Sequence, residues 1–327
     1  MKAYWLLLVG FLISSISIGQ VKKTYEDENH KVVYELRDGR IHGTYQSYYP
    51  NGHQRALGEF ENNYRTGKWI VWDSTGKKQI ERVYSSPFVF EQKHPGGSKE
   101  GPIPILSEPV YKIKYNDEGY IDYFPLEERM IVWAKRIWRK VPADNNLILF
   151  NDKLFQKKLF NLIKTSELPS YGTKNDIFQE EVDLSSVDFD ELDLVAFKLK
   201  EEWFFDCERF VMECRIIGIC PVVESSGDTT DLCWIYFPEL RPYIANVSIE
   251  SNKTPDYIHS LDDLFFYRDF ASTIYKESNV YNQEIADYTA PDMIEKEAER
   301  IELSIIELEH DTWINFAGSN DSKVKIH

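Results

Sequence analysis

Sequence motifs for catalysis are absent from this chain of 327 residues. It has no G-x-S-x-G nucleophile elbow, no glycine-rich phosphate loop, no H-E-x-x-H, and no H-x-E paired with C-x-x-C. These motifs supply the nucleophile, the phosphate cradle or the metal ligands of common enzyme classes. Their absence favours a protein that works without catalysis and without a cofactor.

Cysteine is scarce, with four residues only, Cys207, Cys214, Cys220 and Cys233. Four thiols in a chain of this size do not define a disulfide scaffold. They form no C-x-x-C pair, and no histidine lies at zinc-binding spacing beside them. We therefore expect no metal site.

Long apolar runs are confined to the N-terminus. Residues 1–19 hold one early cation, Lys2, then an apolar run, then small residues before Gln20. This order is typical of a secretory signal peptide cleaved after Gly19. A membrane anchor is the alternative, but the run is shorter than the roughly 20 residues that a spanning helix needs. No cysteine stands at the expected mature start, so we expect an exported protein without a lipid anchor.

Positive charge is also in deficit, with 38 Lys and Arg against 54 Asp and Glu, a net charge of -16. Nucleic acid and anionic lipid both require concentrated cations, so neither is the expected partner. A protein partner with a basic face fits this negative charge better than nucleic acid or anionic lipid does. The length and the 43% hydrophobic content are sufficient for two domains.

A repeat with a period of 24 residues fills 38–84, and its pattern is G-x-aromatic-x-x-aromatic-x-x-x-G. The matched positions are Gly43 with Gly67, Tyr45 with Trp69, Tyr48 with Trp72, and Gly52 with Gly76. Each unit is predicted to be a β-hairpin whose aromatics supply core, and 22–36 is a candidate degenerate copy. A row of aromatics that holds glycan or peptide is the alternative.

This segment resembles the MORN-repeat variant of bacterial proteins, and the resemblance implies a curved single sheet used for contact or spacing. We place this all-β module at 20–86. Clustered Pro and Gly at 87–109 predict a linker that holds the module at a distance without a large interface.

The domain expected at 110–315 is α+β, an antiparallel core hairpin with packed helices, followed by a flexible tail at 316–327. Residues 126–141 place Met130, Trp133, Ile137 and Val141 at helical spacing and predict an amphipathic helix. Its cations, Lys135, Arg136, Arg139 and Lys140, are either a contact for an acidic partner or a solvated helix face.

The core hairpin is predicted from the apolar runs 215–223 and 232–237, which flank a polar turn. Cys220 and Cys233 would lie opposite each other, which makes them a candidate disulfide. A four-residue loop is preferred, because a two-residue Ser226-Gly227 loop would leave Pro221 without a ladder bond.

Three further helices are predicted. The first covers 152–168, and the second begins after Ser260 as N-cap with Asp262 and Asp263 in its first turn. The last covers 291–313 and has an apolar seam with an acidic outer face. The run Glu309-His310-Asp311 in this helix is expected to have a surface or capping role, because adjacent helix residues point in different directions.

Six blocks of the second domain, spread over about 111–315, resemble the GldN/PorN family of gliding-motility and type IX secretion proteins of Bacteroidota. The blocks, in order, are VWAKRIWRKV (132–141), RIIGICPV (215–222), CWIYFPELR (233–241), SLDDLFFYRDF (260–270), IYKESNVYNQEIADY (274–288) and EHDTWI (309–314). The resemblance implies a non-catalytic periplasmic subunit that forms a ring under the outer membrane with a GldK/PorK-like lipoprotein. The repeat module is an addition to the family pattern.

We expect partner contacts on the predicted basic helix and in the KESNVY stretch, which mixes charge with an exposed aromatic. These residues are Arg136, Trp138, Arg139, Lys276, Glu277, Asn279 and Tyr281. The alternative is an exported module whose aromatic repeats bind cell-wall glycan or peptide.

Overall fold

The computed structural model describes residues 19–93, 114–150, 153–174, 176–249 and 254–317. The expected signal peptide, apart from Gly19, lies outside the described residues, as do most of the expected linker and almost all of the tail. Within the described part of the chain, no helix is both long enough and apolar enough to cross a bilayer.

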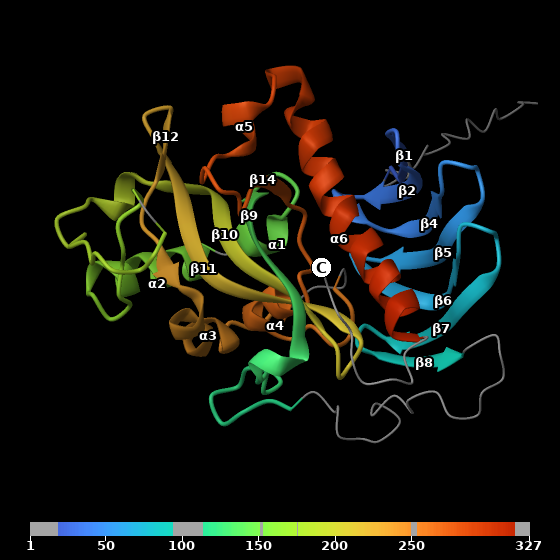
Figure 1. Ribbon diagram of the computed structural model, residues 1–327. Coiled ribbons are helices and arrows are strands. Elements are labelled where there is room, and N and C mark those ends of the chain that lie inside the picture. Colours follow the sequence, from blue (N-terminus) through green and yellow to red (C-terminus); the bar gives the residue numbers. More distant parts are fainter. Residues whose placement is uncertain (1–18, 94–113, 151–152, 175, 250–253, 318–327) are drawn as a thin grey trace, which may run out of the picture.

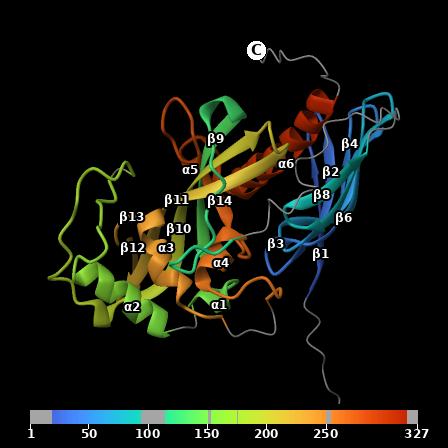
Figure 2. The same ribbon diagram turned by 90° about the horizontal axis from the view of Figure 1, so that it is seen from below.

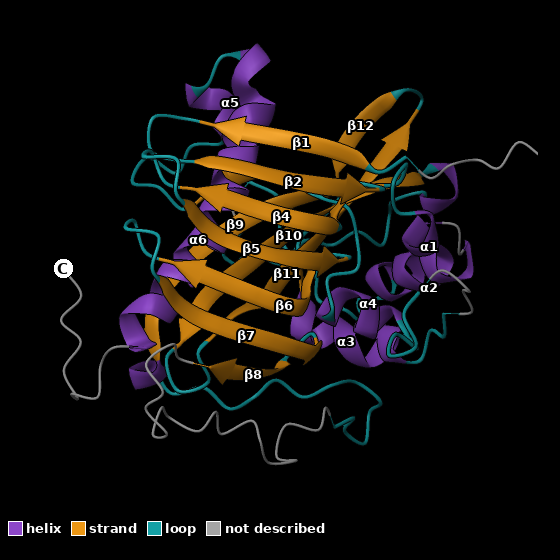
Figure 3. Ribbon diagram, turned by 90° about the vertical axis from the view of Figure 1, so that its right-hand side faces the viewer, coloured by secondary structure: helices purple, strands orange, loops and turns teal. Residues whose placement is uncertain are grey.

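The N-terminal module is one antiparallel sheet in the order β1-β2-β4-β5-β6-β7-β8, with β3 paired to β2. Figure 3 shows these strands laid side by side in nearly sequential order. The expectation of an all-β module is confirmed. The strands are β1 Val21–Glu26, β2 Lys31–Arg37, β3 Arg40–Ile41, β4 Gly43–Tyr48, β5 Gln54–Glu61, β6 Tyr64–Trp72, β7 Lys78–Ser86 and β8 Val89–Lys93.

The two repeat units form the hairpins β4–β5 and β6–β7. Gly52 and Gly76 lie in their turns with φ of +83° each, a conformation that favours glycine. Side chains alternate across the sheet, so Tyr45 and Trp69 are fully buried. Gly58 makes room for this layer, since a Cβ there would lie 2.1 Å from the Trp69 ring.

The second sheet has the strand order β12-β11-β10-β9-β14, with β13 paired to β11. A hairpin turns at the expected place, where Ser225 pairs with Asp228 across a two-residue Ser226-Gly227 turn. Its second strand is the polar Asp228–Asp231 and not the predicted apolar run 232–237, which contributes the short strand Ile235–Tyr236. Both turn residues have positive φ, as type I′ turns require. The strands are β9 Ile131–Pro142, β10 Asp193–Asp206, β11 Val211–Ser225, β12 Asp228–Asp231, β13 Ile235–Tyr236 and β14 Thr273–Glu277.

The preference for a four-residue loop was therefore wrong. Pro221 is tolerated because its carbonyl accepts the Leu232 amide at 2.9 Å, so the ladder keeps a bond there. Cys220 and Cys233 are buried, and both are free thiols in the structure. No disulfide joins them.

The helix expected at 126–141 is wrong, because this segment is strand β9 preceded by one 3₁₀ turn, Glu128–Met130. Ile137, Arg139 and Val141 alternate onto one buried face, which is the period of a strand. Pairing with β10 over almost its full length decides the conformation.

In the described part of the chain, six α-helices accompany this sheet, and α1 to α4 gather at one end of it (Figure 1). Helix α4 begins where expected, because the Ser260 hydroxyl accepts the Asp263 amide at 3.1 Å and the Asp263 carboxylate accepts the Ser260 amide at 3.0 Å. The second domain therefore combines an antiparallel sheet with packed helices, as the predicted α+β class requires. The helices are α1 Leu147–Phe150, α2 Lys153–Lys164, α3 Phe237–Ala245, α4 Leu261–Phe266, α5 Ile285–Tyr288 and α6 Ile294–Ala317.

Helix α6 lies between the two sheets, as Figures 1 and 2 show. Ala298 and Ile301 pack in a cluster with Ile137 of β9, as the predicted apolar seam requires. Leu303 and Trp313 pack in a different cluster with the aromatic layer of the N-terminal sheet. The helix therefore joins the two sheets.

The acidic outer face of α6 meets cations and tyrosines of the N-terminal sheet. The ion pairs and hydrogen bonds join Lys23 to Glu295 at 2.9 Å, Tyr34 to Glu299 at 2.6 Å, Arg55 to Glu307 at 2.8 Å and to Asp311 at 2.7 Å, and Arg65 to Glu309 at 2.5 Å. A module held apart without a large interface is therefore ruled out.

Candidate functional site

Trp138, an expected partner-contact residue, is the centre of one face of the second sheet. It points away from α6, and its neighbours in register are Lys200 of β10 and Lys276 of β14. The Lys276 ammonium lies 4.5 Å and the Lys200 ammonium 5.8 Å from the centre of the indole ring. Cations at these distances are attracted by the negative face of the ring.

A small aromatic cluster surrounds Trp138. The buried members of this cluster are Trp138, Cys220 and Trp234. The partly buried Tyr171, Phe178 and Tyr275 pack against them. This cluster is separate from the main core of the domain. Aromatic groups are thus placed close to the cations of this face.

We call this surface the lysine face and define it by Arg136, Trp138, Lys140, Lys198, Lys200 and Lys276. Three of the cations are paired, Arg136 with Glu202 at 2.6 Å, Lys198 with Asp231 at 2.7 Å and Lys200 with Asp176 at 3.5 Å. For Lys140 and Lys276, no carboxylate partner is found in the described part of the chain. The face therefore carries an excess of positive charge on an acidic protein.

Lys200 lies almost entirely beneath this surface. Burial lowers its pKa, and the nearby Asp176 carboxylate acts in the opposite direction. The indole N–H of Trp138 donates to the same carboxylate. The lysine face thus already accepts one carboxylate from the chain's own 171–181 segment.

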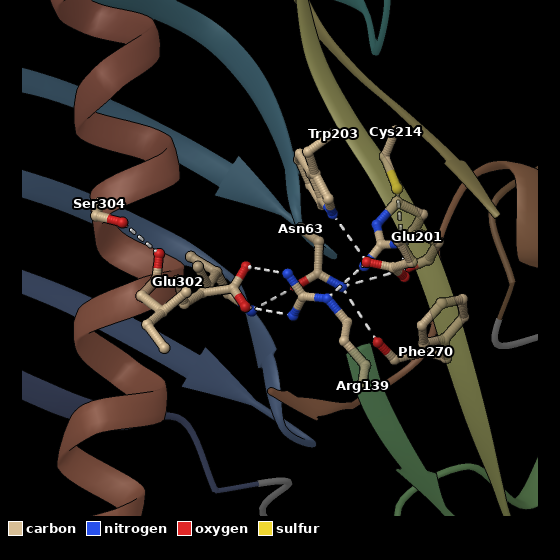
Figure 4. Close-up of polar contacts among 11 residues, drawn as sticks. Asn63, Arg139, Glu201, Trp203, Cys214, Phe270, Glu302 and Ser304 are labelled. Carbon is tan, nitrogen blue, oxygen red and sulfur yellow. Dashed lines mark hydrogen bonds and ion pairs between the residues drawn. The ribbon is translucent and has the colours of Figure 1, made fainter. Parts of the chain in front are cut away.

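Arg139 is not on this face, contrary to the expectation that it contacts a partner. It is buried on the opposite side of the sheet, where it binds Glu201 at 2.9 Å and Glu302 of α6 at 3.1 Å (Figure 4). Arg268 also binds Glu201. Burial opposes ionisation of Glu201, but the two guanidinium groups overcome it and lower the pKa of this carboxyl. Arg139 therefore has a structural role.

A cavity of about 580 Å³ adjoins this ion network, between the two sheets and α6. Its lining includes Tyr64, Trp203, Cys214 and Arg268. The Arg268 guanidinium lies 3.3 Å from the Cys214 sulfur, and the Trp203 N–H donates to Glu201 at 2.8 Å. These polar groups are engaged with one another. In the described residues, no group of three or more His, Cys, Asp or Glu side chains is placed to hold a metal ion.

The remaining expected contact residues lie at the end of β14 and in the loop after it. Glu277 was expected to be available, but it forms ion pairs with Lys135 and, at 3.7 Å, with Arg300. Lys276 stacks on Trp138 as described above. Asn279 and Tyr281 belong to the loop 278–284, which we call the display loop.

Asn279 holds the display loop in shape. Its side-chain amide donates to the carbonyls of Glu277 at 3.0 Å and Gln283 at 2.7 Å, and its oxygen accepts the Tyr281 amide at 3.1 Å. At the tip, Val280 is 96% exposed and Tyr281 81% exposed. The sequence reasoning missed Val280, although an aliphatic residue beside tyrosine in a polar stretch is a usable signal.

His310 does not have the expected surface or capping role. It is fully buried, with its ring 5.9 Å from that of Tyr45, 5.4 Å from Trp69 and 5.1 Å from Trp313. Burial lowers its pKa, although the neighbouring Glu307 carboxylate favours the charged form. His310 therefore belongs to the joint between the N-terminal sheet and α6.

The repeat aromatics divide into two layers. Tyr45 and Trp69 are covered by α6, whereas Tyr48 and Trp72 are half-buried on the opposite face of the sheet. The interpretation of these residues as core holds for the first pair. A glycan or peptide bound by the repeat aromatics would therefore contact Tyr48 and Trp72 and not the buried Tyr45 and Trp69.

Comparison with known families gives a match to the second domain. Residues 126–314 match the family described as Gliding motility associated protein GldN. No curated protein matches the chain. The matched region is more than half of the sequence and runs from the turn before β9 almost to the end of α6, whereas the N-terminal sheet lies outside it. The chain belongs to the GldN family of gliding motility associated proteins.

Proposed function

We propose that this protein is a non-catalytic structural subunit of a type IX secretion and gliding-motility assembly, and that it works through contacts with other proteins. Family membership links it to gliding motility and type IX secretion. The observation that carries the proposal is that the GldN match spans the domain that holds the lysine face and the display loop.

The proposed location is the periplasm, at the inner face of the outer membrane. The signal-like residues 1–19 and the absence of cysteine at the expected mature start support export without lipidation. The proposed partner is a GldK/PorK-like outer-membrane lipoprotein, with which the chain would form a ring. The family resemblance supports this choice of partner.

The surface of the domain supports work through contacts. Val280 and Tyr281 are exposed on a loop that Asn279 fixes in one shape, so little conformational entropy is lost when a partner binds them. Aromatic anchors beside charged groups are typical of interfaces. The display loop continues from β14, which carries Lys276 of the lysine face.

Affinity purification from outer-membrane fractions tests this function. The full-length tagged protein is compared with a Val280→Ser, Tyr281→Ser double variant and with Leu147→Ser, a control for loss of an apolar side chain that is 56% exposed in α1. We expect the wild type and the control to recover a lipoprotein or another secretion component, and the double variant to recover much less. Recovery of no envelope component by the wild type would overturn the proposal.

A second candidate function is the binding of cell-wall glycan or peptide by the N-terminal module. Tyr48 and Trp72 favour it, because they lie half-buried on the face of the sheet that α6 does not cover. A pull-down on cell-wall sugars should then lose binding with Tyr48→Ala or Trp72→Ala. Trp69→Ala is less informative, because Trp69 is a core residue.

A further inference from the structure

A strongly acidic segment, 180–193, leads into β10. It contains seven carboxylates and no Lys or Arg. All seven residues are exposed. They are Glu180, Glu181, Asp183, Asp188, Asp190, Glu191 and Asp193. We call this stretch the acidic segment.

Few of these carboxylates are neutralised within the chain. Asp193 forms an ion pair with Lys153 at 3.4 Å, and it is the sole member of the acidic segment with one in the described ranges. Asp183 and Asp188 accept backbone amides of their own turns. The charges of the remaining four face solvent, which leaves them available for a basic surface.

We propose that the lysine face of one copy binds the acidic segment of a second copy. The two surfaces are opposite in charge, and the chain's net charge of -16 makes a basic patch the favoured docking place for an acidic segment. Asp176 shows how a carboxylate is received, because it accepts the Trp138 N–H and lies 3.5 Å from the Lys200 ammonium. Lys140 and Lys276 provide two further cations beside it.

Within the described residues, no carboxylate of the acidic segment forms an ion pair with a cation of the lysine face of its own copy. Its first residues are fixed near Tyr171, since the Gly172 amide donates to the Glu180 carbonyl at 3.0 Å and Glu181 bridges to Tyr171. Its last residue, Asp193, starts β10 seven positions before Lys200, about 23 Å along a strand. The segment thus begins beside the aromatic cluster around Trp138 and ends at the start of β10.

A contact between two different surfaces is heterologous, so each copy keeps one free surface after pairing. Further copies can then add to the free surfaces. Because the charges lie near solvent, the contact is weak and sensitive to salt. The inference rests on the proposed function, because contacts between copies are functional only if the protein is a subunit of an assembly.

Sedimentation of the mature full-length protein tests this contact. Self-association at about 0.05 M NaCl should weaken at least about tenfold at 0.5 M NaCl, because salt screens exposed charges. The face variant Lys140→Glu, Lys276→Glu should stay monomeric, and so should the segment variant Glu180→Lys, Asp190→Lys, Glu191→Lys. A charge-matched control for the face variant, Lys77→Glu with Lys157→Glu, changes two exposed lysines elsewhere and should associate like wild type.

Mixing the two variants gives the decisive result. The face variant keeps an intact acidic segment and the segment variant keeps an intact lysine face, so the mixture should form 1:1 pairs and nothing larger. A wild type that is monomeric at low salt, a mixture that stays monomeric, or a control as defective as the face variant would each overturn the inference. A monomeric wild type that still recovers envelope partners would leave the proposed function standing.

Discussion

The Tyr45 hydroxyl on β4 donates to the Glu307 carboxylate on α6 at 2.5 Å, across 262 residues of sequence. Glu307 also binds Arg55 of β5 at 2.8 Å. One buried carboxylate thus ties the repeat module to the last helix of the GldN domain. The two parts of the chain are expected to unfold together.

Tyr45→Phe should lower the free energy of unfolding by about 1.5–3 kcal/mol, because a buried charged acceptor loses a hydrogen bond. Urea denaturation of Tyr45→Phe, Glu307→Gln and the double variant measures the coupling between the two residues. Tyr48→Phe is the control, since its hydroxyl bonds Gln46 on the same strand outside the joint. Equal losses for both tyrosine variants would contradict the assigned contact.

Acidification should destabilise the joint. Burial opposes ionisation of Glu307, but His310, Arg55 and Tyr45 lower its pKa from 4.5 to about 2. The carboxyl of the unfolded chain therefore takes up its proton at a higher pH than the folded one, and stability falls as the pH drops below about 4.5.

Burial also lowers the pKa of His310 below its ordinary 6.5. The histidine of the unfolded chain therefore binds its proton at a higher pH than the folded one, and stability falls as the pH drops below about 6.5.

Thermal denaturation of wild type and His310→Gln between pH 7.5 and 5 separates these contributions. The variant should lose less stability than wild type over this range, because it lacks the buried imidazole. His53→Gln changes an exposed histidine in the β4–β5 turn and serves as the control. Identical pH profiles for wild type and His310→Gln would show that this histidine does not titrate differently on unfolding.

Gly58→Ala should destabilise the N-terminal sheet by about 1–3 kcal/mol, because the added methyl would meet the Trp69 ring. The cost should shrink in a Trp69→Leu background, where the smaller side chain leaves room. Calorimetry of the two single variants and the double variant makes the test. An unchanged cost in both backgrounds would assign the effect to backbone conformation instead.

Arg139→Met and Arg136→Met should differ sharply although the residues are three positions apart. Arg139 is buried between Glu201 and Glu302, so its loss removes the cation from Glu302 and leaves the buried Glu201 with Arg268 as its remaining cation, which costs about 3–5 kcal/mol. Arg136 lies at the surface, where an ion pair is worth about 0–1 kcal/mol. Chemical denaturation compares the two, and similar losses would contradict the assignment of the two faces.

Local signals were sufficient for some elements of the fold. The repeat glycines and aromatics predicted the hairpins β4–β5 and β6–β7, and the Ser260 cap predicted the start of α4. These features depend on residues close together in the sequence. The family was also recognisable from short collinear blocks.

Other elements were decided by distant partners. In the segment 126–141, Met130, Trp133, Ile137 and Val141 satisfy helical spacing, but pairing with β10, more than 50 residues later, makes most of the segment strand β9. The acidic face of α6 resembles a solvated helix until the sheet more than 200 residues earlier supplies its cations. The helix predicted for the segment 126–141 also placed Arg139 on the same surface as Arg136 and Trp138. In the strand, successive side chains point to opposite faces, so Arg139 lies on the face opposite to these two residues.

The most direct test of the central claim is photo-crosslinking in cells with a photoreactive residue placed at Tyr281. A structural subunit that works through the display loop predicts a crosslink from this position to an outer-membrane lipoprotein or another secretion component. The same probe at Leu147, an exposed position in α1, should give no such product. No protein adduct at Tyr281, or equal adducts at both positions, would contradict the claim.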